Sequence, residues 1–145
     1  MKIKMAVIRD NIEKCIEQGV YGCSEGRGGL NVSRLSELLP GDRIILYATG
    51  LCKFAGIVEI TKSIFQDETP IWGNGLFPYR VSIKPVIYLP KNNWIDVKSL
   101  VNDLEYFKNK HQWSMHFMQN LRPVSEHDYK ILLNKMSSIC KELKV

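Results

Sequence analysis

The sequence lacks a long apolar run, a Cys-x-x-Cys pair and a strong excess of either charge. Its first ten residues, MKIKMAVIRD, contain two lysines but only the apolar run 5–8, which is too short for a signal-peptide core or a membrane span. We therefore expect a cytoplasmic protein with no membrane partner, in which widely spaced thiols stay reduced. These thiols are Cys15, Cys23, Cys52 and Cys140.

Metal and nucleotide motifs are also missing. His111, His116 and His127 have no metal-ligand spacing among themselves or with the cysteines. The segment GCSEGRGG lacks the Lys-Ser/Thr pair that closes a phosphate-binding loop, so we expect neither a metal nor another cofactor. The net charge of +5 is compatible with a polyanionic partner but selects no function by itself. Lys2 and Lys4 are expected to solvate the N-terminus.

The chain does contain enough apolar residues for one core. Its 145 residues are 45% apolar and show no linker or shift in composition, which predicts one domain spanning 1–145. Strand candidates occupy 5–8, 43–48, 54–61 and 77–89, and helical patterns flank them. This order predicts an α+β domain built on a small curved sheet or barrel.

Capping signals predict where the first helices lie. Asp10 followed by Glu13 three residues later predicts a short helix, which Gly19 ends. The segment 22–29 is too rich in glycine for regular structure. Leucines in 35–39 predict one or two further helical turns before a Pro-Gly pair.

Two more helices are predicted in the C-terminal half. Asp96 is expected to cap a helix, followed by a polar loop over 105–112. Ser125 with Asp128 three residues later predicts the start of a last, long helix. The inner face of that helix is formed by Tyr129, Leu132, Leu133, Met136 and Cys140.

Aromatic residues concentrate around a turn in the middle of the chain. Proline and glycine in 70–78 exclude a helix and place Trp72 and Phe77 in a turn or loop. From Phe77 the residues alternate, with Tyr79 on the apolar side and Arg80 on the polar side of a half-buried strand. Pro85 interrupts that strand, which indicates an edge or a bend.

Two other aromatic positions are predicted to serve packing. Trp94 precedes a helix cap and is expected to anchor it. Trp113, Met115 and Phe117 alternate like a strand that faces the core.

Four segments resemble, in order and spacing, the EVE domain, a member of the PUA-like and YTH-like superfamily. They are PGDRIILYATG, KFAGIVEITKSIF, TPIWGNGLFPYRVSIKPVIYL and MQNLRPVSEHDYKIL. The resemblance implies a PUA-like pseudo-barrel of about five or six mostly antiparallel strands with flanking helices. It also implies a pocket for one nucleobase, often a methylated one, flipped out of a DNA or RNA strand.

The resemblance assigns base-binding roles to nine residues. Tyr21 stands where the family often has Trp, and Trp72 matches the second aromatic. From sequence pattern alone, Trp72 could equally plug the end of the barrel. The remaining seven are Phe77 and Tyr79 in the aromatic wall, Ser24, Arg27 and Asn31 as polar contacts, and Leu121 and Arg122 beside the pocket. Without the family resemblance, the alternation of residues predicts that Phe77 lies in the core, and Arg27 is expected to be a solvated loop residue.

The function predicted in this way is recognition of a modified base in RNA or DNA without catalysis. Stacking contributes about 1 to 3 kcal/mol per base, whereas one buried methyl group adds only about 0.8 kcal/mol. One alternative is a hydrolase of modified nucleosides related to the ASCH proteins, but the Gly-x-Lys-x-x-Glu-x-Arg motif of that group is absent. The other is a module that binds a small ligand or a protein.

Overall fold

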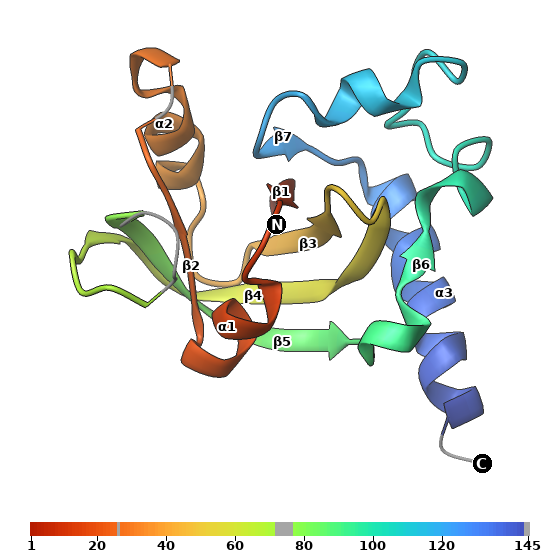
Figure 1. Cartoon of the computed structure of the whole chain (residues 1–145), viewed down its shortest axis with the longest axis horizontal. Coiled ribbons are helices and arrows are strands. Elements are labelled where there is room, and N and C mark those ends of the chain that lie inside the picture. The colour runs from red at the N-terminus through yellow and green to blue at the C-terminus, as the bar shows by residue number, and fades with distance from the viewer. Residues whose placement is uncertain (26, 72–76, 144–145) are drawn as a thin grey trace.

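The chain folds around one curled, mixed β-sheet (Figure 1). The computed structural model describes residues 1–25, 27–71 and 77–143, without the side chain of Arg27. The strands are β1 (Ile3–Ile8), β2 (Val20–Cys23), β3 (Arg43–Ala48), β4 (Lys53–Gln66), β5 (Tyr79–Tyr88), β6 (Ile95–Asp96) and β7 (Arg122–Pro123). Their order is β2-β5-β4-β3-β1-β7, with β6 paired to β4 outside this path. β1 runs parallel to β3, and the other pairs are antiparallel.

The core lies on both faces of β3. Consecutive residues Ile44, Ile45 and Leu46 are fully buried, as expected of a strand covered on both sides. The apolar run 43–48 therefore predicted the bounds of this strand correctly. β4 extends further than predicted because its second half continues to pair with β5 beyond the end of β3.

A close approach and a bulge shape the β4–β5 pair. A Cβ atom on Gly56 would lie 2.4 Å from the Ile87 carbonyl oxygen, so only glycine fits there. Next to it the register shifts, since Ile57 pairs with Ile87 but Val58 pairs with Pro85. Pro85 also lies beyond the end of β2 pairing, where β5 needs no N–H donor on that side. The predicted interruption at Pro85 is confirmed.

Within the described part of the chain, three α-helices cover the sheet and its ends. They are α1 (Ile12–Gln18), α2 (Leu30–Ser36) and α3 (Glu126–Leu143). Gly19 ends α1 with φ of 68°, and the Ser125 hydroxyl accepts a hydrogen bond from the Asp128 N–H at 3.2 Å at the start of α3. Both signals were predicted correctly. No described helix combines the length and the apolar character that a membrane span requires.

Several local predictions are wrong for identifiable reasons. α1 starts after Asn11, whose φ is 78°, rather than after Asp10. Residues 20–23 form β2 despite their glycine, because they pair with β5. Asp96 caps only the 3-10 turn η3 (Val97–Ser99) by accepting from the Lys98 N–H at 2.9 Å. α2 occupies 30–36 rather than 35–39.

The expected strand at 113–117 is instead the 3-10 helix η4 (Trp113–Phe117). Phe117 stacks on Tyr47 with ring centroids 3.7 Å apart, whereas Met115 is 53% exposed. Spacing of four residues, not two, therefore brings Trp113 and Phe117 to the core side. Trp94 is buried and donates to the Leu89 carbonyl at 2.9 Å, which confirms its packing role.

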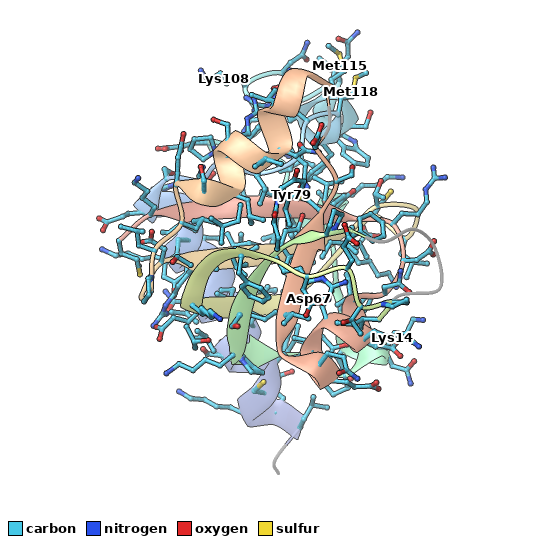
Figure 2. All side chains as sticks on the ribbon, turned by 90° about the vertical axis from the view of Figure 1, so that its left-hand side faces the viewer. Lys14, Asp67, Tyr79, Lys108, Met115 and Met118 are labelled. Carbon is cyan, nitrogen blue, oxygen red and sulfur yellow. The ribbon has the colours of Figure 1, made fainter. Side chains whose placement is uncertain are left out.

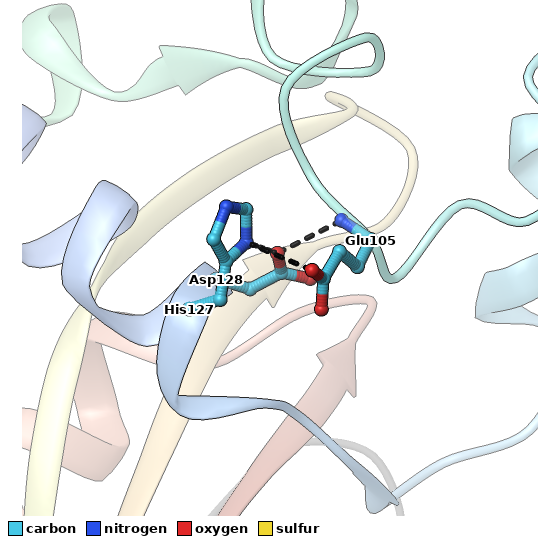
Figure 3. Close-up of side chains that lie close together, drawn as sticks. All are labelled: Glu105, His127 and Asp128. Carbon is cyan, nitrogen blue, oxygen red and sulfur yellow. Dashed lines mark hydrogen bonds and ion pairs between the residues drawn. The ribbon is translucent and has the colours of Figure 1, made fainter.

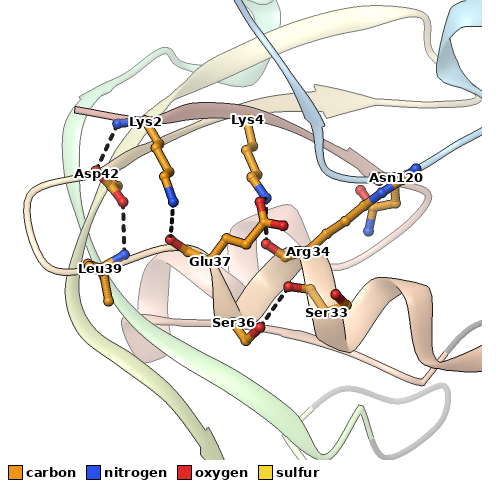
Figure 4. A network of polar contacts seen from close by, with 9 residues as sticks. All are labelled: Lys2, Lys4, Ser33, Arg34, Ser36, Glu37, Leu39, Asp42 and Asn120. Atoms are coloured by element: carbon orange, nitrogen blue, oxygen red, sulfur yellow. Dashed lines mark hydrogen bonds and ion pairs between the residues drawn. The ribbon is translucent and has the colours of Figure 1, made fainter.

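Buried polar contacts fix α2 against β1 (Figure 4). The Lys4 ammonium is 4% exposed and donates to the Arg34 carbonyl at 2.6 Å and to Glu37 at 2.7 Å. The carboxylate of Asp42 accepts from the backbone N–H groups of Lys2 and Leu39. The prediction that Lys4 solvates the N-terminus is therefore wrong. These contacts hold the C-terminal end of α2 against the N-terminal half of β1.

Candidate functional site

A pocket of about 350 Å³ opens where the end of β1, the start of α1, β2 and α2 meet. Four residues predicted from the sequence lie together in its lining, namely Tyr21, Ser24, Asn31 and Phe77. Backbone and side chains of 7–11 form another part of the wall. The pocket thus combines two aromatic rings with hydroxyl and amide groups.

Asn120 organises the polar side of this pocket. Its side-chain oxygen accepts from the backbone N–H groups of Val7 at 2.8 Å and Leu121 at 2.9 Å. The amide nitrogen therefore faces the Tyr21 hydroxyl and donates to it at 2.7 Å. Because the Tyr21 oxygen accepts this bond, its own proton can be donated to another acceptor. Burial raises the pKa of Tyr21 well above its ordinary value, so the hydroxyl stays protonated.

Asn11 is a second amide in the lining. Its backbone is left-handed, a conformation that asparagine adopts more readily than most residues, and its carbonyl accepts from the Cys15 N–H at 3.0 Å. Although Asn11 occupies the N-cap position of α1, its side chain makes no capping hydrogen bond. The helix therefore does not require this amide, which can bind a polar ligand edge.

The thiol of Cys23 in β2 also lines the pocket. Burial raises the pKa of this thiol to about 11. At neutral pH it is therefore a protonated, weakly polar group and not a nucleophilic thiolate.

Comparisons with known proteins identify the family. The model of the EVE domain matches residues 16–135. This chain belongs to the EVE domain family. A UPF0310 protein of Pyrococcus horikoshii is 34% identical, and the alignment covers 86% of this chain and 90% of that protein.

The fold of this EVE domain is also similar to solved structures of YTH domains, at low sequence identity. The YTH domain of the Zygosaccharomyces rouxii MRB1 protein, solved in complex with N6-methyladenosine RNA, has a TM-score of 0.69 at 15% identity and covers 93% of this chain and 86% of its own. The mmi1 YTH domain in its RNA complex has a TM-score of 0.72 at 11% identity, with coverage of 99% and 87%. The predicted PUA-like α+β fold is therefore confirmed.

Not all predicted residues of this EVE domain line the pocket. Among the described residues, Tyr79 instead donates from its hydroxyl to Glu25 at 3.0 Å, on the face seen in Figure 2. Leu121 is buried beside the pocket, and its N–H donates to the Met5 carbonyl. Arg122 lies in β7, away from the lining. Trp72 and the side chain of Arg27 lie outside the described residues, so their roles stay predictions.

Arg80 connects the two ends of the segment that carries Trp72. Its side chain is 1% exposed, which contradicts the predicted polar face of β5. The guanidinium donates to the Thr69 carbonyl at 2.5 Å and the Phe77 carbonyl at 3.2 Å, and it lies 3.5 Å from the Asp67 carboxylate. A buried cation needs such partners, and here they place Phe77 at the pocket.

A second polar cluster joins α3 to the loop at 105–106 (Figure 3). Glu105, His127 and Asp128 have ligand atoms within 4.8 Å of one another, as a metal site would need. The buried Asp128 carboxylate, however, already accepts from the backbone N–H groups of Glu105 at 2.8 Å and Tyr106 at 2.7 Å. His127 bonds to the same carboxylate, which with Glu105 raises the pKa of His127. The cluster is a clamp between two segments of the fold.

Proposed function

We propose that this EVE domain is a non-catalytic nucleic-acid-binding module that accepts one modified base of an RNA or DNA strand. The pocket that holds Tyr21, Asn11, Phe77 and Asn120 is the observation that carries this proposal. A flipped base presents two flat faces and one polar edge, which call for rings and for donors and acceptors respectively. A volume of about 350 Å³ lies at the small end of ligand pockets, which span about 300–1,000 Å³.

The fold comparison supports the choice of ligand. The Zygosaccharomyces rouxii YTH domain, which has the same fold, was solved with N6-methyladenosine RNA. N6-methyladenine is accordingly the first modified base to test with this chain. We expect Trp72 to supply another ring that stacks on the base, which is the role that the family resemblance assigns to it.

Discrimination by this pocket depends on its polar edge. Packing around one methyl group contributes about 0.8 kcal/mol, or roughly fourfold in affinity. Leaving one buried polar group without a partner costs about 1–3 kcal/mol, or roughly 5- to 150-fold. We therefore assign selectivity to Asn11, Asn120 and the Tyr21 hydroxyl, and we assign most of the affinity to stacking and phosphate contacts.

Two ionisable groups of the pocket, Cys23 and Tyr21, support binding over catalysis. General acid–base catalysts work best with a pKa near the working pH. The pKa of Cys23 is raised to about 11, and that of Tyr21 is raised further. Both groups thus stay protonated at neutral pH and serve as donors or packing groups.

Fluorescence anisotropy with matched RNA and DNA oligonucleotides tests the proposal. The strands carry adenine, N6-methyladenine, cytosine, 5-methylcytosine or 5-hydroxymethylcytosine at one central position. The key variant is Asn11→Gly, because glycine tolerates the observed φ of 78° and the change removes only the side chain. We expect about tenfold weaker binding of the preferred strand, corresponding to about 1.4 kcal/mol. Trp72→Ala should weaken the same complex at least as much.

Asn102→Gly is the matched control, because Asn102 is an exposed turn residue that does not line the pocket. It should bind like the wild type. Equal affinity of the wild type for every base in the panel would contradict recognition of a modified base. Unchanged binding in both Asn11→Gly and Trp72→Ala would contradict the assignment of the pocket.

A further inference from the structure

A second hollow adjoins the pocket. It has a volume of about 830 Å³ and runs between α2 and the segment 115–122. Asn31 and Asn120 line both hollows, so the two hollows lie side by side. We call this second hollow the α2 groove.

Two arginines line the α2 groove, one from each side. Arg34 of α2 donates to the Asn120 carbonyl at 2.8 Å (Figure 4). It also donates to the Gln119 side chain at 3.0 Å. Arg122 of β7 lies over the Tyr106 ring at 5.4 Å and donates to a backbone carbonyl at 3.3 Å. Within residues 1–25, 27–71 and 77–143, neither guanidinium forms an ion pair with a carboxylate. Both cations are therefore oriented by neutral groups and keep their charge for an anionic ligand.

His116, which also lines the α2 groove, senses this positive charge. Its pKa is lowered by burial and then by the charges of Arg122, Lys108 and Lys110. Its ring nitrogen accepts a hydrogen bond from the Asn109 N–H at 3.2 Å, as a neutral imidazole does. Four cationic side chains thus surround the groove or lie within electrostatic reach of it.

Exposed apolar side chains lie along the same groove. Met115 is 53% exposed, Met118 is 80% exposed and Leu30 is 43% exposed. Figure 2 shows both methionines with Lys108 at one end of the molecule. Single exposed apolar residues are ordinary, but three along one cationic hollow form a surface of mixed character. A nucleic-acid strand has the same mixture, because charged phosphates alternate with flat bases, and methionine packs well against aromatic rings.

We infer that the α2 groove binds the single strand that flanks the base in the pocket, with Arg34 and Arg122 contacting phosphates and Met115 and Met118 packing against neighbouring bases. This inference rests on the proposed function of the pocket. An acidic protein surface would also suit the charge. The strand is favoured because the groove lies directly beside the pocket, with Asn31 and Asn120 lining both.

Charge insertion at the methionines tests the inference without disturbing the fold. Met115→Glu/Met118→Glu places two carboxylates at exposed positions, where they repel phosphates. Leu143→Glu is the matched control, since Leu143 is 49% exposed and lies at the end of α3. The probes are RNA and DNA nonamers with one central N6-methyladenine, the same strands unmodified, and the free nucleoside N6-methyladenosine followed by NMR shifts.

We expect the double variant to bind the nonamers at least about tenfold more weakly at low salt, with the difference shrinking as salt rises. Arg122→Gln should reduce the slope of log K against log salt by roughly 0.7 per lost phosphate contact. The free nucleoside should bind the methionine double variant and Arg122→Gln as it binds the wild type, because it does not reach the α2 groove.

The outcomes separate the groove from the pocket. Wild-type affinity of the double variant for every nonamer overturns the inference while leaving the pocket proposal intact. Binding of the nucleoside but of no strand also overturns it. Strand binding that the double variant loses, together with no preference for the modified base and no nucleoside binding, supports the groove and refutes the pocket proposal. Tight binding of acidic peptides in place of all strands would reassign the α2 groove to a protein partner.

Discussion

Tyr21→Phe removes a single oxygen from the pocket and tests the hydrogen-bond order inferred for Asn120. The ring stays, so buried apolar area is unchanged, but the Asn120 amide nitrogen loses its partner at 2.7 Å. A buried polar group left unpaired costs about 1–3 kcal/mol. We expect the free energy of unfolding to fall by about 1–2 kcal/mol, which lowers the melting temperature by about 2–4 °C per kcal/mol in a chain of this size.

Asn120→Ala should cost more, because it also removes the acceptor of the Val7 N–H, whereas the Leu121 N–H keeps the Met5 carbonyl as an acceptor. We expect a loss of about 2–4 kcal/mol. In the double variant the two losses should overlap by about 1 kcal/mol, since the shared bond can be removed only once. Urea unfolding followed by circular dichroism measures all four proteins. Strictly additive losses would refute the direct bond, and a neutral Tyr21→Phe would show that solvent replaces the Tyr21 hydroxyl as the partner of the half-buried Asn120 amide.

Three further changes test other contacts of the fold. Gly56→Ala should destabilise by about 3 kcal/mol or prevent folding, because its Cβ would collide with the β5 backbone at 2.4 Å; a normal urea midpoint would contradict this register. Arg80→Leu should speed cleavage of 67–77 in limited proteolysis and weaken base binding, because both ends of that segment lose their shared donor; unchanged rates would show that other contacts suffice. The pKa of His127 is raised by Asp128, so its stabilisation is full below the unfolded pKa of 6.5 and is lost as pH rises through the folded pKa. His127→Gln should therefore lower the melting temperature at about pH 5.5 but not at about pH 8.5, and equal shifts at both pH values would exclude an ionic contribution.

Elements with strong local signals could be predicted from the sequence. β3 is an uninterrupted apolar run between two turns, and α3 begins at a serine cap, so each pattern favours one structure. β2 could not be predicted, because it runs into a glycine-rich segment and gains strand structure only by pairing with β5, about sixty positions later. At 113–117 three alternating apolar residues are too few to separate a strand from a 3-10 helix, and Phe117 stacking on Tyr47 decided between them.

The site shows the same division between local and distant causes. Tyr21, Ser24, Asn31 and Phe77 could be placed near one another only through the family resemblance, and the fold does gather them. Asn120 was missed because its side chain bonds to a residue 99 positions away, which leaves no local pattern.

Asn11 carries a weak local signal in the sequence. Asp10 and Asn11 stand together between a strand and a helix, and asparagine is the better residue for a left-handed turn. Sequence therefore favours Asn11 as the residue before α1, but only the fold brings its amide to the pocket.

Asn120 belongs to both hollows at once. Its side chain faces the pocket and bonds to Tyr21, while its backbone carbonyl is held by Arg34 on the α2 groove. A phosphate that draws Arg34 toward the groove therefore acts on the residue that orients the Tyr21 hydroxyl. Occupation of one hollow is expected to change the affinity of the other, and thermodynamic reciprocity makes the two effects equal. The domain would then respond to a base and its flanking strand as one coupled ligand, so measurements on the isolated nucleoside would leave out the part of the selectivity that the flanking strand sets.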